Sequence, residues 1–175
     1  MTVLIRRLEE QDEVESFDCG DEPLNNYLKQ HAWANQQKSS IGVTYVAVDD
    51  AAPRSVLGYF TLATASAPGD AFQKKYVRGL PPYDLSLILL ARPGLERRFS
   101  GKELGHALIS EAFKNALRVA DDVGCRCIIT DAYRDQIDWY ARYGFVALEG
   151  AAESGPQRMF LDIRTVRMAR GSSHS

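Results

Sequence analysis

The sequence lacks any apolar run that approaches the roughly 18 residues needed for a membrane-spanning helix. It has only three cysteines in 175 residues, Cys19, Cys125 and Cys127, too few and odd in number for a disulfide scaffold. Two arginines closely follow the first apolar residues, which argues against a signal peptide. We therefore expect a cytoplasmic protein with reduced thiols, no metal site and no membrane contact.

An excess of positive charge is also missing. The 21 basic and 23 acidic residues leave a net charge of −2, so any contact with RNA has to rest on a local patch. Neither an internal repeat nor a low-complexity linker interrupts the chain. With 45% apolar residues, the sequence predicts a single domain over residues 1–170 and a loose tail over 171–175.

What the sequence does contain is an order of elements typical of a mixed α/β fold. β-rich runs at 2–8, 42–48 and 56–65 predict strands, the last two as an antiparallel pair. The continuous apolar run Leu85–Leu90 predicts a central strand, buried on both faces and stopped by Pro93.

Helical periodicity is strongest between Lys102 and Val123, with Gly124 as the stop and Ser100 and Glu103 forming a capping box. The other expected elements are helices at 24–35, 71–78 and 135–143 and strands at 125–130, 145–148 and 159–163. Together they predict a central mixed sheet of about six to seven strands with about four helices on its two faces.

The junction between the strand at 85–90 and the helix at 102–123 reads LILLARPGLERRFSGKELGHAL. Gly101 and Gly105 bracket the helix start, where free amides and the helix dipole can bind an anion. Arg97, Arg98 and Lys102 add positive charge beside them. The spacing suits a pyrophosphate group, but glycines that allow close packing beside solvated cations explain it equally well.

The same string resembles the acetyl-coenzyme A loop of the GNAT superfamily of N-acetyltransferases, Arg/Gln-x-x-Gly-x-Gly/Ala after the fourth strand. Arg98, Gly101 and Glu103 fall on its three defined positions, although Glu103 replaces a small residue. The resemblance implies a GNAT fold and acetyl-CoA as cofactor, with the amide of Leu95 as a better donor than Pro93, which has none. The cofactor-binding residues it implies are Leu90, Ala91, Arg92, Leu95, Arg97, Arg98, Gly101, Lys102, Glu103, Leu104, Gly105 and Tyr140.

A second motif, WYARYGF, runs from Trp139 to Phe145. On its own, Tyr140 is more simply a helix aromatic packed on the sheet. GNAT proteins carry Tyr-x-x-x-Gly-Phe at this distance beyond the loop, and the resemblance implies that Tyr140 is catalytic and protonates the departing thiolate. A phenol with a pKa of about 10 is protonated at neutral pH. No general base is obvious, since Glu96 only lies near the strand end and His106 is better explained as a packed or surface histidine.

Two further segments, FDCGDEPLNNYL and GYFTLA, make about residues 15–165 similar to the GNAT toxins of type II toxin–antitoxin systems. Phe17, Gly20, Leu24, Tyr27 and Leu28 match the toxin pattern Phe-x-x-Gly-x-x-x-Leu-x-x-Tyr/Trp-Leu. The resemblance implies acetylation of the α-amine of aminoacyl-tRNA, neutralisation by a ribbon-helix-helix antitoxin, and a homodimer.

A tRNA substrate requires cations near the site, because phosphate contacts dominate non-specific affinity. The chain has three basic groups: Lys74, Lys75 and Arg78; Arg97, Arg98 and Lys102; Arg158, Arg164, Arg167 and Arg170. We expect the first group to bind substrate and the acids to gather at 9–22 and 49–50, although a solvated surface is the commoner meaning of such groups.

Two alternative functions stay open at the level of sequence. One is a GNAT enzyme that acetylates a small-molecule or protein amine. The other is a weakly catalytic acyl-CoA-binding module, which Glu103 and Pro93 suggest because both depart from the pattern of the loop.

Overall fold

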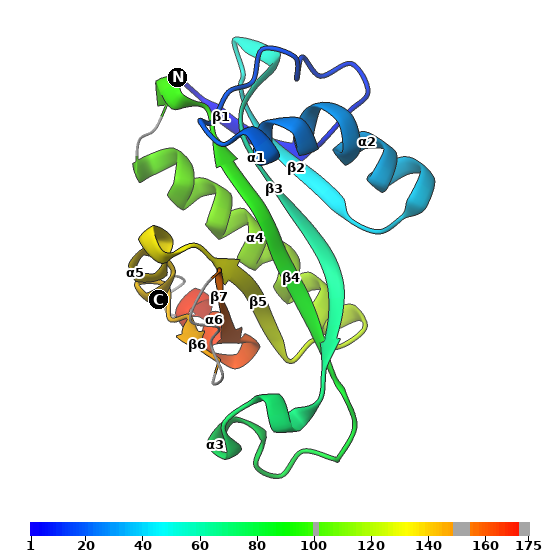
Figure 1. Ribbon diagram of the computed structural model, residues 1–175, viewed down its shortest axis with the longest axis vertical. Helices are drawn as coiled ribbons and strands as arrows, with labels where there is room; N and C mark the ends of the chain where they lie inside the picture. Colours follow the sequence, from blue (N-terminus) through cyan, green and yellow to red (C-terminus); the bar gives the residue numbers. More distant parts are fainter. Residues whose placement is uncertain (100–101, 149–154, 172–175) are drawn as a thin grey trace. The chain divides into compact units, whose positions relative to one another are not determined.

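The computed structural model describes residues 1–99, 102–148 and 155–171 (Figure 1). Its strands are β1 Val3–Arg7, β2 Val43–Asp49, β3 Ala52–Ala67, β4 Leu85–Leu95, β5 Cys127–Ala132, β6 Val146–Ala147 and β7 Gln157–Asp162. Its α-helices are α1 Glu22–Asn26, α2 Ala32–Ala34, α3 Lys74–Val77, α4 Lys102–Asp122, α5 Ile137–Ala141 and α6 Ile163–Gly171. None of the helices among the described residues is long and apolar enough to cross a membrane.

The strands form a seven-stranded sheet in the order β1-β2-β3-β4-β5-β7-β6. β4 pairs with β5 in parallel, whereas β1 with β2, β2 with β3, β5 with β7 and β6 with β7 are antiparallel. The mixed α/β fold class is therefore confirmed, and β4 occupies the central position that its continuous apolar run predicts.

The chain divides into two compact units. The first comprises residues 1–63 and 90–114, and the second comprises 64–89 and 115–175. Phe17, Leu28 and Tyr59 belong to the core of the first unit, and Phe72 and Phe160 to the core of the second. The expectation of a single domain over 1–170 stays a prediction, and the tail expected from residue 171 lies outside the described residues beyond Gly171.

Helix α4 confirms the strongest periodicity of the sequence. Leu104, Leu108, Ala112 and Ala116 are all buried along one side of it. Gly124 follows with φ of +89°, a left-handed conformation that favours glycine and ends the helix. The capping box expected at Ser100 lies outside the described residues.

The first helical segment is longer than predicted. Its start is as expected, because the Asp21 side chain accepts the Leu24 N–H at 3.3 Å and Pro23 stands in the first turn. The chain then stays helical as far as Ser39, with π-helical hydrogen bonding over Tyr27–His31 and Asn35–Ser39. A period of 3.6 residues does not anticipate such wider turns.

Strand β4 corrects one prediction, since it passes through Pro93 and ends at Leu95. Arg92 directly before the proline has φ of +55°, so the strand is irregular at this point. A proline is tolerated in a strand at such an irregularity, where no regular ladder needs its missing N–H.

Helix α6 was not predicted, because the pattern of β7 leads into it without a loop. The Asp162 side chain ends β7 and accepts the backbone N–H of Arg164 at 2.8 Å, which caps the new helix. Ile163 and Val166 are buried one turn apart. The remaining elements overlap their predicted ranges, but β3 begins at Ala52 instead of residue 56 and passes through Pro53, and β5 starts at Cys127.

Gly58 on β3 provides a test of the packing of the first unit. A Cβ atom added there would lie 2.9 Å from Cδ2 of Leu95, 3.0 Å from Cδ1 of Leu108 and 3.1 Å from the Gly94 carbonyl oxygen. We expect Gly58→Ala to lower the free energy of unfolding by about 1–3 kcal/mol, the usual result of overpacking. Urea denaturation measures this loss. Gly69→Ala is the control, because nothing lies within 4 Å of its added Cβ, and equal effects of both substitutions would contradict the packing described.

Candidate active site

The loop after β4 carries two exposed arginines. It forms a short 3-10 turn, Arg97–Phe99, directly before α4. The side chains of Arg97 and Arg98 are 65% and 69% exposed. Both cations therefore stand ahead of the positive end of a long helix, an arrangement that can bind a phosphate. Gly101 and the Lys102 side chain, which the sequence adds to this loop, lie outside what is described.

Each arginine has a carboxylate partner that the sequence analysis missed. Arg98 Nε lies 3.4 Å from Oε1 of Glu96, and Arg97 Nε lies 3.5 Å from Oδ2 of Asp18. Hydrogen bonds from the Asn25 amide and the Gly20 N–H, with the Arg97 guanidinium nearby, hold the pKa of Asp18 below its usual range. Asp18 is therefore ionised at neutral pH beside Arg97.

Glu96 is not placed as a general base. The residue is only 5% exposed, and its Oε2 accepts the backbone N–H of Asp18 at 2.9 Å. Both carboxylate oxygens thus have partners, Oε2 the Asp18 N–H and Oε1 the Arg98 guanidinium, and neither is left to contact a substrate amine. His106 is exposed on α4, which agrees with its interpretation as a surface residue.

The other residues expected in the cofactor site have mixed environments. The Arg92 guanidinium lies over the ring of Tyr27, 4.2 Å from the centroid, in a cation–π contact. Ala91 and Leu95 are half-buried and Glu103 is exposed, whereas Leu90, Leu104 and Gly105 are buried. The part of these residues in binding a cofactor remains a prediction. The buried residues would contact a cofactor through their main-chain groups.

Tyr140 on α5 lies in the second unit, with 1% of its surface exposed. Its ring packs edge-on against Trp139 and Phe145, at centroid distances of 4.9 and 5.4 Å. Its hydroxyl bonds to the side chain of Thr130 on β5. Burial raises the pKa of Tyr140 above its ordinary value, so the phenol carries its proton at neutral pH.

The three basic groups differ in how their charge is compensated. Arg158 forms two hydrogen bonds with Asp131, Arg164 pairs with Asp162, and Arg167 pairs with Asp121. This group is therefore not a free basic patch, because local acids neutralise it. Lys74, Lys75 and Arg78 are exposed and make no ion pair with the described residues.

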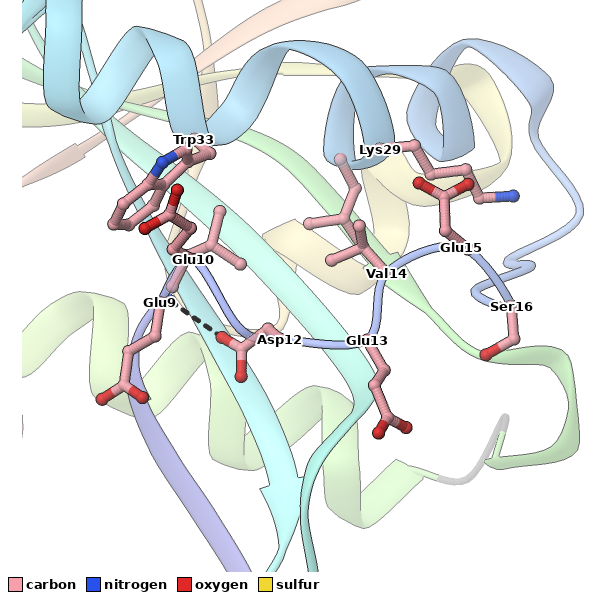
Figure 2. A pocket seen from close by; sticks show the side chains of 11 residues that line it. Glu9, Glu10, Asp12, Glu13, Val14, Glu15, Ser16, Lys29 and Trp33 are labelled. Atoms are coloured by element: carbon pink, nitrogen blue, oxygen red, sulfur yellow. Dashed lines mark hydrogen bonds between the residues drawn. The ribbon is translucent and has the colours of Figure 1, made fainter.

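The acids at 9–15 do gather, and they line a pocket of the first unit (Figure 2). The pocket encloses about 440 Å³ and has Leu8, Leu28 and Trp33 among its lining residues. Figure 2 shows the carboxylates of Glu9, Glu10, Asp12, Glu13 and Glu15 around it. Such a lining repels a pyrophosphate, so this pocket is not the anion site.

Comparison with known proteins gives the class of this protein. No protein-family model matches the chain. The chain is 32% identical over 142 residues to a tRNA-acetylating toxin of Mycobacterium tuberculosis, an alignment that covers 80% of this chain and 82% of the relative.

Two solved structures share the fold. AtaT complexed with acetyl-methionyl-tRNAfMet has a TM-score of 0.85 at 22% identity, over 97% of this chain and 99% of that one. A tyrosine-to-phenylalanine mutant of AtaT bound to the C-terminus of the antitoxin AtaR and acetyl-CoA has a TM-score of 0.77 at 20% identity, over 96% and 98%. The fold is thus shared with these toxins, and the 32% identity to the tRNA-acetylating toxin shows that the chain belongs to the family of tRNA-acetylating GNAT toxins.

The raised pKa of Tyr140 can be tested directly. In protein labelled with 13C at the tyrosine Cζ, the signal that disappears in Tyr140→Phe reports this phenol. We expect its titration midpoint to lie above about 10, the ordinary value, because burial disfavours the phenolate. The same label in urea-unfolded protein gives the reference. A folded-state midpoint at or below the reference would contradict the buried environment.

Proposed function

We propose that this protein transfers an acetyl group from acetyl-CoA to the α-amine of an aminoacyl-tRNA and thereby blocks translation. The observation that carries the chemistry is the buried, protonated phenol of Tyr140, bonded to Thr130. The similarity to a tRNA-acetylating toxin over 80% of the chain supports the choice of substrate. The enzymatic alternative with a small-molecule or protein amine has no comparable support.

The arginine loop fits the anionic part of acetyl-CoA. Arg97 and Arg98 are exposed before the N-terminus of α4, so their guanidinium groups and the free helix amides bind the pyrophosphate together. Before this loop, a main-chain N–H near Leu90 or Leu95 on β4 polarises the thioester carbonyl; these residues are five positions apart on the strand, so one oxygen contacts only one of them. Pro93 between them has no N–H and takes no part.

Acetyl-CoA supplies the acetyl group as an activated thioester. The amine nitrogen forms the new C–N bond, the C–S bond breaks, and the amine loses a proton to water. Tyr140 donates its O–H proton to the sulfur, and the Thr130 hydroxyl stabilises the phenolate that remains until solvent returns a proton. An α-amine in an aminoacyl ester needs no dedicated base, which agrees with the buried position of Glu96.

The segment around α3 binds the tRNA backbone. Phe72 and Tyr76 both pack edge-on against Phe160, at 5.2 and 4.8 Å between centroids. Arg126 also donates to the Tyr76 carbonyl oxygen at 2.8 Å. These contacts hold the segment against the core, while the side chains at 74, 75 and 78 are exposed and can contact tRNA phosphates; the Lys75 ammonium also lies over the Tyr76 ring.

The protein acts in the cytoplasm, as one domain over 1–170, and is neutralised by a ribbon-helix-helix antitoxin. The structure of AtaT bound to the C-terminus of the antitoxin AtaR supports an antitoxin as partner. A homodimer fits the sheet, because β1 and β6 are edge strands with Leu4 and Val146 exposed.

Mass spectrometry of aminoacyl-tRNA after incubation with the protein and acetyl-CoA tests the activity. We expect an added acetyl group with the wild type. In Tyr140→Phe we expect kcat to fall about 100-fold or more, because the thiolate leaves unprotonated, while coenzyme A binding is kept. Growth arrest on expression should be lost with the same substitution.

Three outcomes would contradict the proposal. Growth arrest that survives Tyr140→Phe argues against acetyl transfer as its cause. Coenzyme A binding without acetylation of any amine by the wild type favours the weakly catalytic binding module. Acetylation of free amines or proteins but not of aminoacyl-tRNA favours the other enzymatic alternative.

Replacing Lys74, Lys75 and Arg78 by alanine tests the tRNA surface. Each phosphate contact that is lost lowers the slope of log affinity against log salt by about 0.7–0.9. We expect weaker tRNA binding and a slope reduced by about 2, with an unchanged KM for acetyl-CoA. Lys38→Ala, which removes an exposed cation elsewhere, is the control. An unchanged salt slope in the triple variant would exclude this segment from the interface.

A further inference from the structure

The turn Phe17–Gly20 lies against the arginine loop. It belongs to the toxin-like FDCG segment, for which the proposed chemistry has no use. The Asp18 N–H donates to Oε2 of Glu96 at 2.9 Å, and the Arg97 N–H donates to the Asp18 carbonyl oxygen at 3.0 Å. These two reciprocal hydrogen bonds join segments that are 78 residues apart in the sequence.

The carboxylate of Glu96 connects this turn to Arg98. Each of its oxygens has a different partner, Oε2 the main chain of Asp18 and Oε1 the Nε of Arg98 at 3.4 Å. Burying a carboxylate is unfavourable unless both oxygens are compensated, and these contacts supply the compensation. The position of the Arg98 head group is therefore coupled to the position of the turn.

Arg97 is held by the turn in the same way. Its Nε lies 3.5 Å from Oδ2 of Asp18, while Oδ1 accepts the Gly20 N–H and the Asn25 amide, both at 2.9 Å. Gly20 has φ of +86°, and a Cβ atom there would lie 2.9 Å from Arg97 Nε. Because glycine has no Cβ, the Arg97 side chain can lie directly against the turn at Gly20.

Both ion pairs use Nε of the arginine. The two Nη groups carry four of the five guanidinium N–H donors, and they form no hydrogen bond with the described residues. A phosphate accepts hydrogen bonds from such donors in pairs. Carboxylates at Nε thus orient the guanidinium and leave its phosphate-binding donors available.

We propose that Glu96, together with Asp18, is a positioning residue for coenzyme A: it holds Arg98 and Arg97 in the orientation that binds the pyrophosphate. The inference rests on the proposed function, since it assigns the support of the same loop. Orientation of the arginines and simple charge predict opposite changes in phosphate binding when the carboxylate is neutralised. Loss of a negative charge beside the arginines strengthens phosphate binding if charge alone matters, and weakens it if orientation matters.

Glu96→Gln is the decisive variant, because it keeps the shape and an acceptor for the Asp18 N–H but loses the ion pair. We expect the KM for acetyl-CoA to rise about tenfold, the effect of losing one hydrogen bond to a charged group, with kcat changed by less than about twofold. Acetyl-pantetheine, which lacks the pyrophosphate, should react with wild type and variant at the same kcat/KM. Asp18→Asn should raise the KM for acetyl-CoA in the same direction.

Glu22→Gln is the matched control, since it removes one exposed carboxylate from α1 and should change neither constant. Thermal melting of each variant shows whether it is folded, and if Glu96→Gln does not fold, Asp18→Asn decides. An unchanged or lower KM for acetyl-CoA, or an equal loss with acetyl-pantetheine, overturns the inference. Failure of the proposed function is recognised separately, because the wild type itself then neither binds coenzyme A nor transfers acetyl groups.

Discussion

Tyr59 connects the sheet, helix α1 and the turn at Phe17 in the core of the first unit, and the placement of the arginine loop depends on these contacts. The residue is fully buried on β3, and its hydroxyl donates to the Leu24 carbonyl oxygen at 2.7 Å. Its ring packs edge-on against Phe17 and stacks on Tyr27, at 5.6 and 6.5 Å between centroids. A buried phenol without an acceptor is strongly unfavourable, so this hydrogen bond ties α1 to the sheet. The turn that starts at Phe17 is thereby brought to the end of β4.

Periodicity predicted the elements whose stability depends on one repeating pattern. In α4 the apolar positions follow the helical period for 21 residues, and in β4 the apolar run reflects burial on both faces, so both were found. Features that depend on tertiary contacts were not predicted. The start of α6 depends on a capping contact of Asp162, and the passage of β4 through Pro93 depends on the left-handed backbone of Arg92. Neither has a periodic signal in the sequence.

The candidate site shows the same contrast between features with a local sequence signal and features that depend on tertiary contacts. Arg97 and Arg98 could be proposed from their position before a long helix, and Tyr140 from its resemblance to a family motif. Their carboxylate partners could not, because Asp18 and Glu96 are far apart in sequence and each is locally unremarkable as an acid. Charge counting also grouped the arginines at 158, 164 and 167 as a basic cluster, although only Lys74, Lys75 and Arg78 were assigned to substrate binding. Only the structure shows that the arginines at 158, 164 and 167 are paired with carboxylates, whereas the cations at 74, 75 and 78 make no ion pair with the described residues.

The division into two units has a consequence for how the chain is made. Three elements, β3, β4 and α4, continue from one unit into the other, so neither unit is a contiguous stretch of sequence. During synthesis the first 63 residues emerge well before residues 90–114, which complete the first unit, and only residues 64–89 of the second unit precede that completion. Tyr140 is added later still. A ribosome-bound fragment therefore contains the whole arginine loop before it contains the phenol.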